Sequence, residues 1–423
     1  MQKRRPSYYN FIHKFQDGRT LIWNTYTGSI FLIDVNEFRE FEMQSGEWFE
    51  ENRHYFIDSG VLVDSIGQSE QLNYIIDKRK NAVTENKTIA YTILPTTACN
   101  ARCPYCFEKN NTTITMTSEF LEKIVTFIVQ ESTSFESIYI TWFGGEPLLF
   151  KDRITTIIEQ LRLNCKDKEI CCDIITNGVL FDEETAQQAA KEWFVKNVQI
   201  SLDGTEKNYE RIKNYINIQN AYQIVLNNIQ HLIDNNITVS IRLNIDKANM
   251  KDMIALIDEL HDRFGKQIQV YPYPIFETTT NKNGLILKNE LPQYFSELFE
   301  KLKRTGYREK ICEFKEFIPW YCASTLPHNF VIMPNGQLLK CQSEIGQNLY
   351  LGNVEQGVTD LLRNNEYSSI NIDDDCIRCC YLPICQGGCL ASTKCASKIE
   401  RCCLEKYYLH DLIEKYYLEE IEE

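Results

Sequence analysis

Histidine and positive charge are both scarce in this sequence. Six histidines stand among 423 residues, and none forms an HExxH pattern or a close pair, so zinc-protease chemistry has no support. Lysine and arginine total 45 against 59 aspartates and glutamates, which gives a net charge of −14. A protein that wraps nucleic acid or coats an anionic membrane needs a basic face, and this balance argues against both.

Long apolar runs are missing as well. The sequence has no stretch of 18 apolar residues, and its basic N-terminus is not followed by an apolar run of signal-peptide length. We therefore expect no membrane-spanning helix and a cytoplasmic location. The length alone predicts two or three domains.

Cysteine is abundant but unevenly placed. Residues 1–98 contain none of the 17 cysteines, three lie within 99–106, and eleven lie between Cys312 and Cys403. An odd number excludes complete intramolecular disulfide pairing. In a reducing compartment, clustered cysteines indicate metal ligands or redox groups.

Strand-like and helix-like segments alternate through the middle of the chain. Strands are predicted over 89–94, 137–142, 172–176, 198–202, 239–245 and 268–273, and helices near 118–131, 151–163, 183–193, 217–234 and 249–263. Six strand–helix repeats predict an α/β fold with a parallel sheet, open or closed into a partial (β/α)6 barrel resembling a TIM barrel. In such folds the loops after the strands carry the chemistry.

The flanking regions predict two smaller domains. Residues 1–85 indicate a hairpin over 8–33, a polar helix, a short strand at 60–63 and another helix, without a catalytic constellation. The cysteine-rich end carries a hairpin signal at 334–336 and a helix at about 400–421. The predicted domains are 1–85 (small α+β), 86–310 (the barrel, with a linker from 276 that ends in a helix) and 311–423.

The first cysteine group has the spacing C-x3-C-x2-C, directly after the first barrel strand: Cys99, Cys103 and Cys106. Three thiolates on one loop can hold three irons of a four-iron cluster and leave the fourth iron open. Zinc would need a fourth ligand, and none lies nearby. In this position the motif resembles the radical S-adenosylmethionine (SAM) superfamily. The resemblance implies that SAM binds the open iron and that the reduced cluster cleaves it to a 5′-deoxyadenosyl radical, which abstracts hydrogen.

Further motifs of that superfamily follow the next three strands in order: Gly144-Gly145-Glu146-Pro147, Thr176-Asn177-Gly178 and Ser201-Leu202-Asp203-Gly204. Each alone is an ordinary turn, but their joint order after successive strands favours the resemblance. It implies that the glycines let the backbone approach the methionine group and that an acceptor meets its ammonium. Arg211, or alternatively Arg242, would pair with the SAM carboxylate. The implied SAM contacts are Tyr105, Gly144, Gly145, Glu146, Asn177, Ser201, Asp203 and Arg211.

The C-terminal cysteines resemble the SPASM extension of some radical SAM enzymes. Thirteen residues separate Cys322 from Gly336 and four more precede Cys341, before a C-x2-C-x5-C-x3-C run and a final Cys402-Cys403 pair. The resemblance implies two auxiliary [4Fe-4S] clusters, three clusters in all. One would use Cys322, Cys341 and Cys389, with a fourth position open to substrate or filled by an extra cysteine such as Cys312. The other would use Cys376, Cys379, Cys385 and Cys402, which fits better than Cys403. A zinc ribbon is the alternative for this region.

SPASM enzymes mostly act on peptides and proteins, and two subgroups compete here. Peptide maturases form thioether or carbon–carbon crosslinks in ribosomally made precursor peptides. Anaerobic sulfatase-maturing enzymes instead form formylglycine, and their expected base is an Asp directly after the second auxiliary cysteine. That position holds Gln342, whose amide cannot act as a general base at neutral pH.

The N-terminal region resembles a reduced peptide-recognition element, which would capture a leader peptide as an added strand; a packing domain is the alternative. The implied partners are a precursor peptide and a reductant such as flavodoxin or ferredoxin. Candidate pocket residues after the last strand are Tyr271, Tyr273 and Glu277, the last as a catalytic candidate. A non-catalytic iron–sulfur or zinc protein is the alternative of a different class, but it leaves the ordered loop motifs unexplained.

Overall fold

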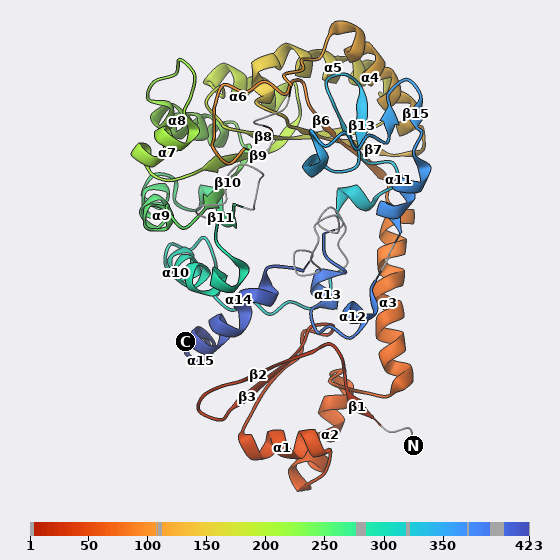
Figure 1. The fold of residues 1–423 in the computed structure, drawn as a ribbon, viewed down its shortest axis with the longest axis vertical. Helices are drawn as coiled ribbons and strands as arrows, with labels where there is room; N and C mark the ends of the chain where they lie inside the picture. The colour runs from red at the N-terminus through yellow and green to blue at the C-terminus, as the bar shows by residue number, and fades with distance from the viewer. Residues whose placement is uncertain are drawn as a thin grey trace.

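The computed structural model describes residues 4–106, 108, 112–275, 285–318, 322–369, 372–389 and 402–422. In Figure 1 the barrel lies at the top, the N-terminal region at the bottom, and cysteine-rich C-terminal segments lie between them. The long helix α3 (Ser65–Thr84) runs along one side from the N-terminal region towards the barrel. Within these ranges, no helix combines the length and the apolar character needed to cross a membrane.

Six neighbouring strands form the barrel, and each pairs in parallel with the next. This confirms the predicted partial (β/α)6 barrel. The strands begin up to three residues earlier than predicted and run over β6 (Thr88–Ile93), β7 (Ser137–Trp142), β8 (Glu169–Thr176), β9 (Val195–Leu202), β10 (Thr238–Ile245) and β11 (Ile268–Pro274).

Alternate residues of the strands face the helices and most of them are buried, such as Val198, Ile200 and Leu202 of β9. The residues between them point to the inner face, which is polar. There Arg242 of β10 stands opposite Ser201 of β9 in the ladder. One apolar face therefore anchors the barrel while the other is available for binding.

The helices between the strands include the five predicted ones, α4 (Ser118–Glu131), α5 (Lys151–Asn164), α6 (Glu183–Lys191), α8 (Ala221–Asp234) and α9 (Met250–Phe264). A further helix, α7 (Glu206–Lys213), was not predicted. It buries only Tyr209, Ile212 and Lys213, so its apolar periodicity is too weak to detect. The prediction also began α8 too early, because Asn217 and Asn220 adopt left-handed backbone conformations.

The barrel sheet continues into the C-terminal region. Strand β12 (Phe330–Ile332) pairs in parallel with β6, and the turn ending at Gly336 (φ 76°) returns the chain as β13 (Gln337–Leu339). Two short strands, β14 (Gly352–Asn353) and β15 (Gly357–Val358), extend the edge. The predicted boundary at residue 310 therefore divides one continuous sheet.

The N-terminal region contains a three-stranded antiparallel sheet rather than a two-stranded hairpin. Its strands are β2 (Asn10–Lys14), β3 (Thr20–Asn24) and β4 (Ile30–Ile33). The segment 20–33 divides because the Asn24 side chain accepts the N–H groups of Tyr26 and Thr27 and so forms a second turn. The predicted polar helix is also two helices, α1 (Val35–Met43) and α2 (Glu47–Asp58), followed by a short pair of β1 (Arg5–Pro6) and β5 (Leu62–Val63).

Helix α10 (Leu291–Arg304) follows the last barrel strand. The α-helices described in the C-terminal region are α11 (Leu361–Ser368), α12 (Asp374–Ile377), α13 (Leu382–Cys385), α14 (Glu405–Leu412) and α15 (Leu418–Glu422). The N-terminal sheet packs directly on this region. The Phe11 ring stacks on His410 with 4.3 Å between centroids, and Thr25 Oγ1 donates to the Cys380 carbonyl at 2.5 Å.

Candidate active site

The first cysteine group lies on the loop that follows β6, and neighbouring segments hold this loop at several points. Near its start, the Thr97 N–H donates to the Ile114 carbonyl (2.9 Å). Further on, the Arg102 N–H donates to the Lys213 carbonyl, and the Asn100 carbonyl accepts from the Ile216 N–H, each at 2.8 Å. The unpredicted helix α7 therefore fixes the position of the cysteine loop.

The three thiols on this loop influence one another. Burial raises the pKa of the Cys99 thiol to about 12, and nearby Glu146, Cys103 and Cys106 add to the effect. Burial also raises the pKa of Cys103 and of Cys106. Three thiolates this close need compensating positive charge, which an iron cluster supplies. The donor set therefore fits the cluster implied by the resemblance.

Two glycines bring the loop after β7 against the cysteine loop. The Gly145 N–H donates to the Thr96 carbonyl (3.2 Å), and the Glu146 N–H donates to the Ala98 carbonyl (2.8 Å). A Cβ on Gly144 would lie 2.3 Å from the Thr96 oxygen, and one on Gly145 would lie 2.2 Å from the Ala98 oxygen. Only glycine fits at either position, because both distances are far below van der Waals contact.

Glu146 is fully buried and joins the loops after β7 and β8. Its carboxylate accepts from the Thr176 hydroxyl (2.8 and 2.9 Å), the Asn177 N–H (2.9 Å) and the Leu148 N–H (3.1 Å). The Asn177 amide in turn donates to Asn100 Oδ1 at 2.7 Å, on the cysteine loop. Glu146 therefore holds the loops of the site together, and its contact with the SAM ammonium stays a prediction.

A buried ion pair lies beside the cysteine loop. Lys213 Nζ stands 2.9 Å from Asp203 Oδ2 and donates to Ser201 Oγ at 2.7 Å. The Tyr105 hydroxyl donates to Asp203 Oδ1 at 2.6 Å, and Asn244 Nδ2 donates to the same oxygen at 3.2 Å. Burial by itself lowers the pKa of Lys213, but Asp203 and the other neighbours raise it well above its usual value, so the lysine stays charged.

Neither predicted arginine takes part in this network. Arg211 is exposed and donates to Asn208 Oδ1 (3.2 Å), and Arg242 lies over the Tyr273 ring at 3.9 Å. Sequence reasoning missed Lys213, which is the buried cation. The i, i+4 spacing of Tyr209 and Lys213 on one face of α7 was the available signal.

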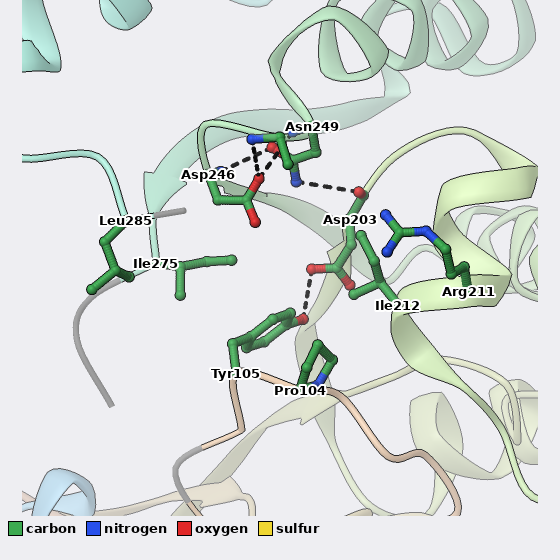
Figure 2. Close-up of a pocket in the computed structure, with 10 residues that line it drawn as sticks. Pro104, Tyr105, Asp203, Arg211, Ile212, Asp246, Asn249, Ile275 and Leu285 are labelled. Carbon is green, nitrogen blue, oxygen red and sulfur yellow. Dashed lines mark hydrogen bonds between the residues drawn. The ribbon is translucent and has the colours of Figure 1, made fainter. Parts of the chain in front are cut away.

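A cavity of about 200 Å³ opens next to the ion pair. Figure 2 shows Tyr105 and Asp203 pointing towards one another in its wall, with Arg211 on one side and Ile275 and Leu285 on the other. The lining combines apolar side chains, such as Ile212 and Ile275, with polar ones, such as Asp203, a mixture that suits a ring system carrying hydroxyl groups. On the cysteine loop, Asn100 Nδ2 is buried and has no hydrogen-bond partner among the described residues. The residues present therefore fit a SAM molecule bound at the cysteine loop.

Two of the predicted auxiliary-cluster ligands carry matching hydroxyl contacts. The Ser324 hydroxyl donates to Cys322 Sγ (3.2 Å), and Ser343 Oγ lies 3.1 Å from Cys341 Sγ. Burial raises the pKa of Cys341, and the neighbouring Cys322 and Cys389 add to this rise. The Cys341 thiol thus lies near Cys322 and Cys389, and the joint role of the three as ligands stays a prediction.

Cys385, a predicted ligand of the second auxiliary cluster, contacts one member of the terminal cysteine pair. A hydrogen bond between the Cys385 and Cys403 thiols lowers the pKa of Cys385 and raises that of Cys403. Cys402 Sγ instead accepts from Lys406 Nζ at 3.7 Å. Of the terminal pair it is thus Cys403 that contacts Cys385, and Cys402, Cys376 and Cys379 as ligands stay a prediction.

Cys312, the candidate extra ligand, contacts the C-terminal helices instead of these groups. Cys312 is buried, and its thiol donates to the Leu412 carbonyl (3.4 Å) while its N–H donates to Glu420. These contacts favour an open fourth position on the first auxiliary group. Within the described ranges, no three His, Cys, Asp or Glu side chains converge on a single-ion site. A four-iron cluster places its thiolates on different irons, so its ligands stand farther apart.

The structure describes two of the three candidate pocket residues. The Tyr271 hydroxyl donates to Gln199 Oε1 at 2.7 Å across the inner face, and Tyr273 lies under Arg242. Burial raises the pKa of Tyr273, and nearby Cys389 opposes the lowering by Arg242. Tyr273 is therefore a residue of the last barrel strand, β11, that lies near Cys389. Glu277 lies outside the described residues.

Three cysteines follow the first strand of this partial barrel, and loops with glycine, asparagine and acidic residues follow the next three strands. Together this fold and this site define the radical SAM class. In agreement, residues 93–260 match the Radical SAM superfamily. Residues 93–260 therefore carry a radical SAM domain, and the curated relatives of the chain include enzymes.

Two curated relatives show how the likeness is distributed. The cysteine-type anaerobic sulfatase-maturating enzyme of Clostridium novyi is 25% identical over 349 residues, which cover 72% of this chain and 88% of that protein. The Fe-coproporphyrin III synthase of Methanosarcina barkeri is 28% identical over 167 residues, 40% of this chain and only 39% of that protein. The second match therefore concerns the barrel-sized part alone.

Two solved structures share the fold. Native anSMEcpe with bound AdoMet and Cp18Cys peptide has a TM-score of 0.63 and 19% identity, covering 79% of this chain and 98% of that one. Streptococcus suis SuiB bound to precursor peptide SuiA has a TM-score of 0.54 and 16% identity, covering 97% of this chain and 99% of that one. The likeness to SuiB thus extends over almost the whole chain.

Proposed function

We propose that this enzyme matures a ribosomally made precursor peptide by forming a thioether or carbon–carbon crosslink. The N-terminal region carries the proposal, because it provides an open sheet edge for a peptide. The two solved structures cover different shares of this chain, 79% for anSMEcpe and 97% for SuiB, and this difference supports the proposal. The additional part of the chain that aligns with SuiB but not with anSMEcpe is similar in size to residues 1–85.

The proposed cofactors are SAM and three [4Fe-4S] clusters, on the cysteine sets predicted above. When bound, the first cluster and SAM supply a 5′-deoxyadenosyl radical able to abstract a hydrogen atom. Tyr105, Asp203 and Lys213 hold one side of the site in a fixed, buried geometry. Lys213, rather than Arg211, would meet the SAM carboxylate, because it is the buried ammonium beside the cysteine loop. The electrons would come from a flavodoxin or ferredoxin.

The outer edge of β4 is the proposed leader-binding edge. Asn24 N–H donates to the Ser29 carbonyl (2.8 Å), and bonded and non-bonded pairs alternate along an antiparallel ladder. Ile22 and Phe31 therefore form the next bonded pair, and Ile30 directs its N–H and C=O away from β3. Among the described strands, β4 has no partner on that side. A peptide can add there as a fourth strand.

Replacing Ile30 by proline is expected to weaken binding of the leader peptide about tenfold, because it removes an outward N–H from that edge. Fluorescence anisotropy with the labelled leader measures the change. Ile12 is the matched control. It is 36% exposed against 39% for Ile30, and it also points its N–H outward, on the opposite edge strand β2. Equal effects of Ile12→Pro and Ile30→Pro would contradict binding at β4.

The alternative function is sulfatase maturation, which the Clostridium novyi relative favours. Gln342 stands where that chemistry expects a carboxylate base. The nearest acid along the chain, Glu344, is 2% exposed and accepts hydrogen bonds from Arg363 and Tyr367. Neither side chain can take a proton from a substrate, so peptide crosslinking is the better-supported function.

Anaerobic co-expression with a short precursor peptide encoded beside this gene tests the proposal. We expect each crosslink to lower the peptide mass by two hydrogens, about 2 Da, and fragmentation to locate the bond. Cys103→Ala is the matched control and should leave the mass unchanged. Formylglycine in a sulfatase peptide, with no mass change in the precursor, would instead establish the alternative. Failure to form 5′-deoxyadenosine with intact clusters would contradict both.

A further inference from the structure

The same short motif recurs at two of the predicted auxiliary ligands. Cys322-Ala323-Ser324 and Cys341-Gln342-Ser343 each place a serine two residues after the cysteine. Each cysteine caps a single 3-10 turn, over Ala323–Thr325 in one case and Gln342–Glu344 in the other. The two segments lie 19 residues apart in the sequence, yet they adopt the same local fold.

Each turn aims its serine hydroxyl back at the cysteine sulfur. The distances are 3.2 Å from Ser324 Oγ to Cys322 Sγ and 3.1 Å from Ser343 Oγ to Cys341 Sγ. Once the thiols are deprotonated, the sulfur can only accept, so both hydroxyls must donate. Ser324 is 8% exposed and is held in a buried position, whereas Ser343 is exposed.

A buried lysine fixes the two turns relative to one another. Lys340, directly before Cys341, is 2% exposed. Its ammonium donates to the carbonyls of Leu326 (2.6 Å) and Asn329 (3.3 Å), in the loop that follows Ser324. The backbone segments that carry the two turns are therefore held together by the buried lysine.

We propose that Ser324 and Ser343 set the reduction potential of the auxiliary cluster held by Cys322, Cys341 and Cys389. The inference rests on the ligand set of the proposed function. A hydrogen bond to a ligand sulfur draws charge from it, which favours the form that carries one more electron. The step is a one-electron uptake, supplied by dithionite in the test, and no covalent bond forms or breaks. These are positioning residues that act through the sulfurs.

The test is a redox titration of the anaerobically reconstituted full-length enzyme, followed by electron paramagnetic resonance, with iron and sulfide counted beforehand. Ser324→Ala is expected to lower the equilibrium constant for reduction of one cluster about tenfold, which is about 59 mV for a one-electron couple. Ser343→Ala should lower it about threefold, because an exposed hydroxyl also competes with water. The Ser324→Ala/Ser343→Ala double variant should lower the equilibrium constant by the product of the two factors.

Two controls distinguish an effect on the reduction potential from a loss of the cluster-binding structure. Ser324→Thr keeps a hydroxyl and should leave the potential at the wild-type value. Ser132 contacts the sulfur of Cys165 (3.9 Å), a cysteine outside the predicted ligand sets, so Ser132→Ala should change no potential. Unchanged potentials in both alanine variants with full iron would overturn the inference. Loss of about four irons from both would also overturn it, because the serines would then hold the site rather than tune it.

The same measurements distinguish this inference from the proposed function. Wild-type protein with about four irons and bound zinc would contradict the auxiliary ligand sets themselves. About twelve irons with no response to the serine substitutions would contradict the tuning role alone.

Discussion

Replacing Lys213 by methionine is expected to lower 5′-deoxyadenosine formation by about 100-fold or more, because the buried ammonium is lost. Asp203, which is fully buried, would be left as an unpaired carboxylate. Breaking a buried pair in this way costs about 3–5 kcal/mol of folding free energy. Liquid chromatography of the dithionite-reduced reaction measures the nucleoside, and thermal unfolding measures the stability.

A double variant separates stability from SAM binding. In Asp203→Asn/Lys213→Met both charges are removed, so the unfolding temperature should recover while the nucleoside yield stays low. Arg211→Ala is the matched control one helical half-turn away. Since Arg211 is exposed and bonds only to Asn208 in the described contacts, its loss should change the yield by less than about threefold. If Arg211→Ala abolished the reaction and Lys213→Met preserved it, the assignment of the carboxylate contact to Lys213 would be wrong.

Much of the barrel could be predicted from the sequence because its strands have a strong pattern. In β7, Ile138, Ile140 and Trp142 are fully buried and alternate with partly exposed residues, and the five predicted helices carry clear apolar faces. The loop motifs after these strands were equally readable, because glycine, asparagine and aspartate stood at the strand ends. For the barrel, the apolar periodicity of the strands and the position of the motifs after them were therefore sufficient for the prediction.

The parts that were missed depend on contacts distant in the sequence. Strand β12 belongs beside β6, a pairing that joins residues 330–332 to 91–93 and that no local pattern reveals. Lys213 was overlooked because a lysine near the end of a polar helix is ordinarily solvated. Its burial follows from the packing of α7 against the cysteine loop. The choice between Cys402 and Cys403 likewise depends on side-chain placement that spacing cannot resolve.

Replacing Gly145 by alanine is expected to lower 5′-deoxyadenosine formation about 100-fold, because a displacement of about 1 Å at a catalytic loop has this effect. The new Cβ would lie 2.2 Å from the Ala98 carbonyl oxygen. Ala98 directly precedes Cys99, so the cysteine loop itself must move. Backbone conformation is not the obstacle, since Gly145 has no positive φ. The loss of 5′-deoxyadenosine formation would therefore be due to the lack of space between the two loops.

Gly67 provides the matched control for that substitution. It also lacks a positive φ, and a Cβ there would meet its nearest neighbour at an ordinary 3.5 Å. Because Gly67 lies in α3, Gly67→Ala should raise stability by about 0.5 kcal/mol and leave SAM cleavage unchanged. Iron analysis adds a second readout: Gly145→Ala should lose the irons of the first cluster and keep those of the C-terminal region, which lies on separate loops. Retention of full SAM cleavage by Gly145→Ala would show that the two loops can separate without cost to the site, and would remove the structural basis for the glycine pair.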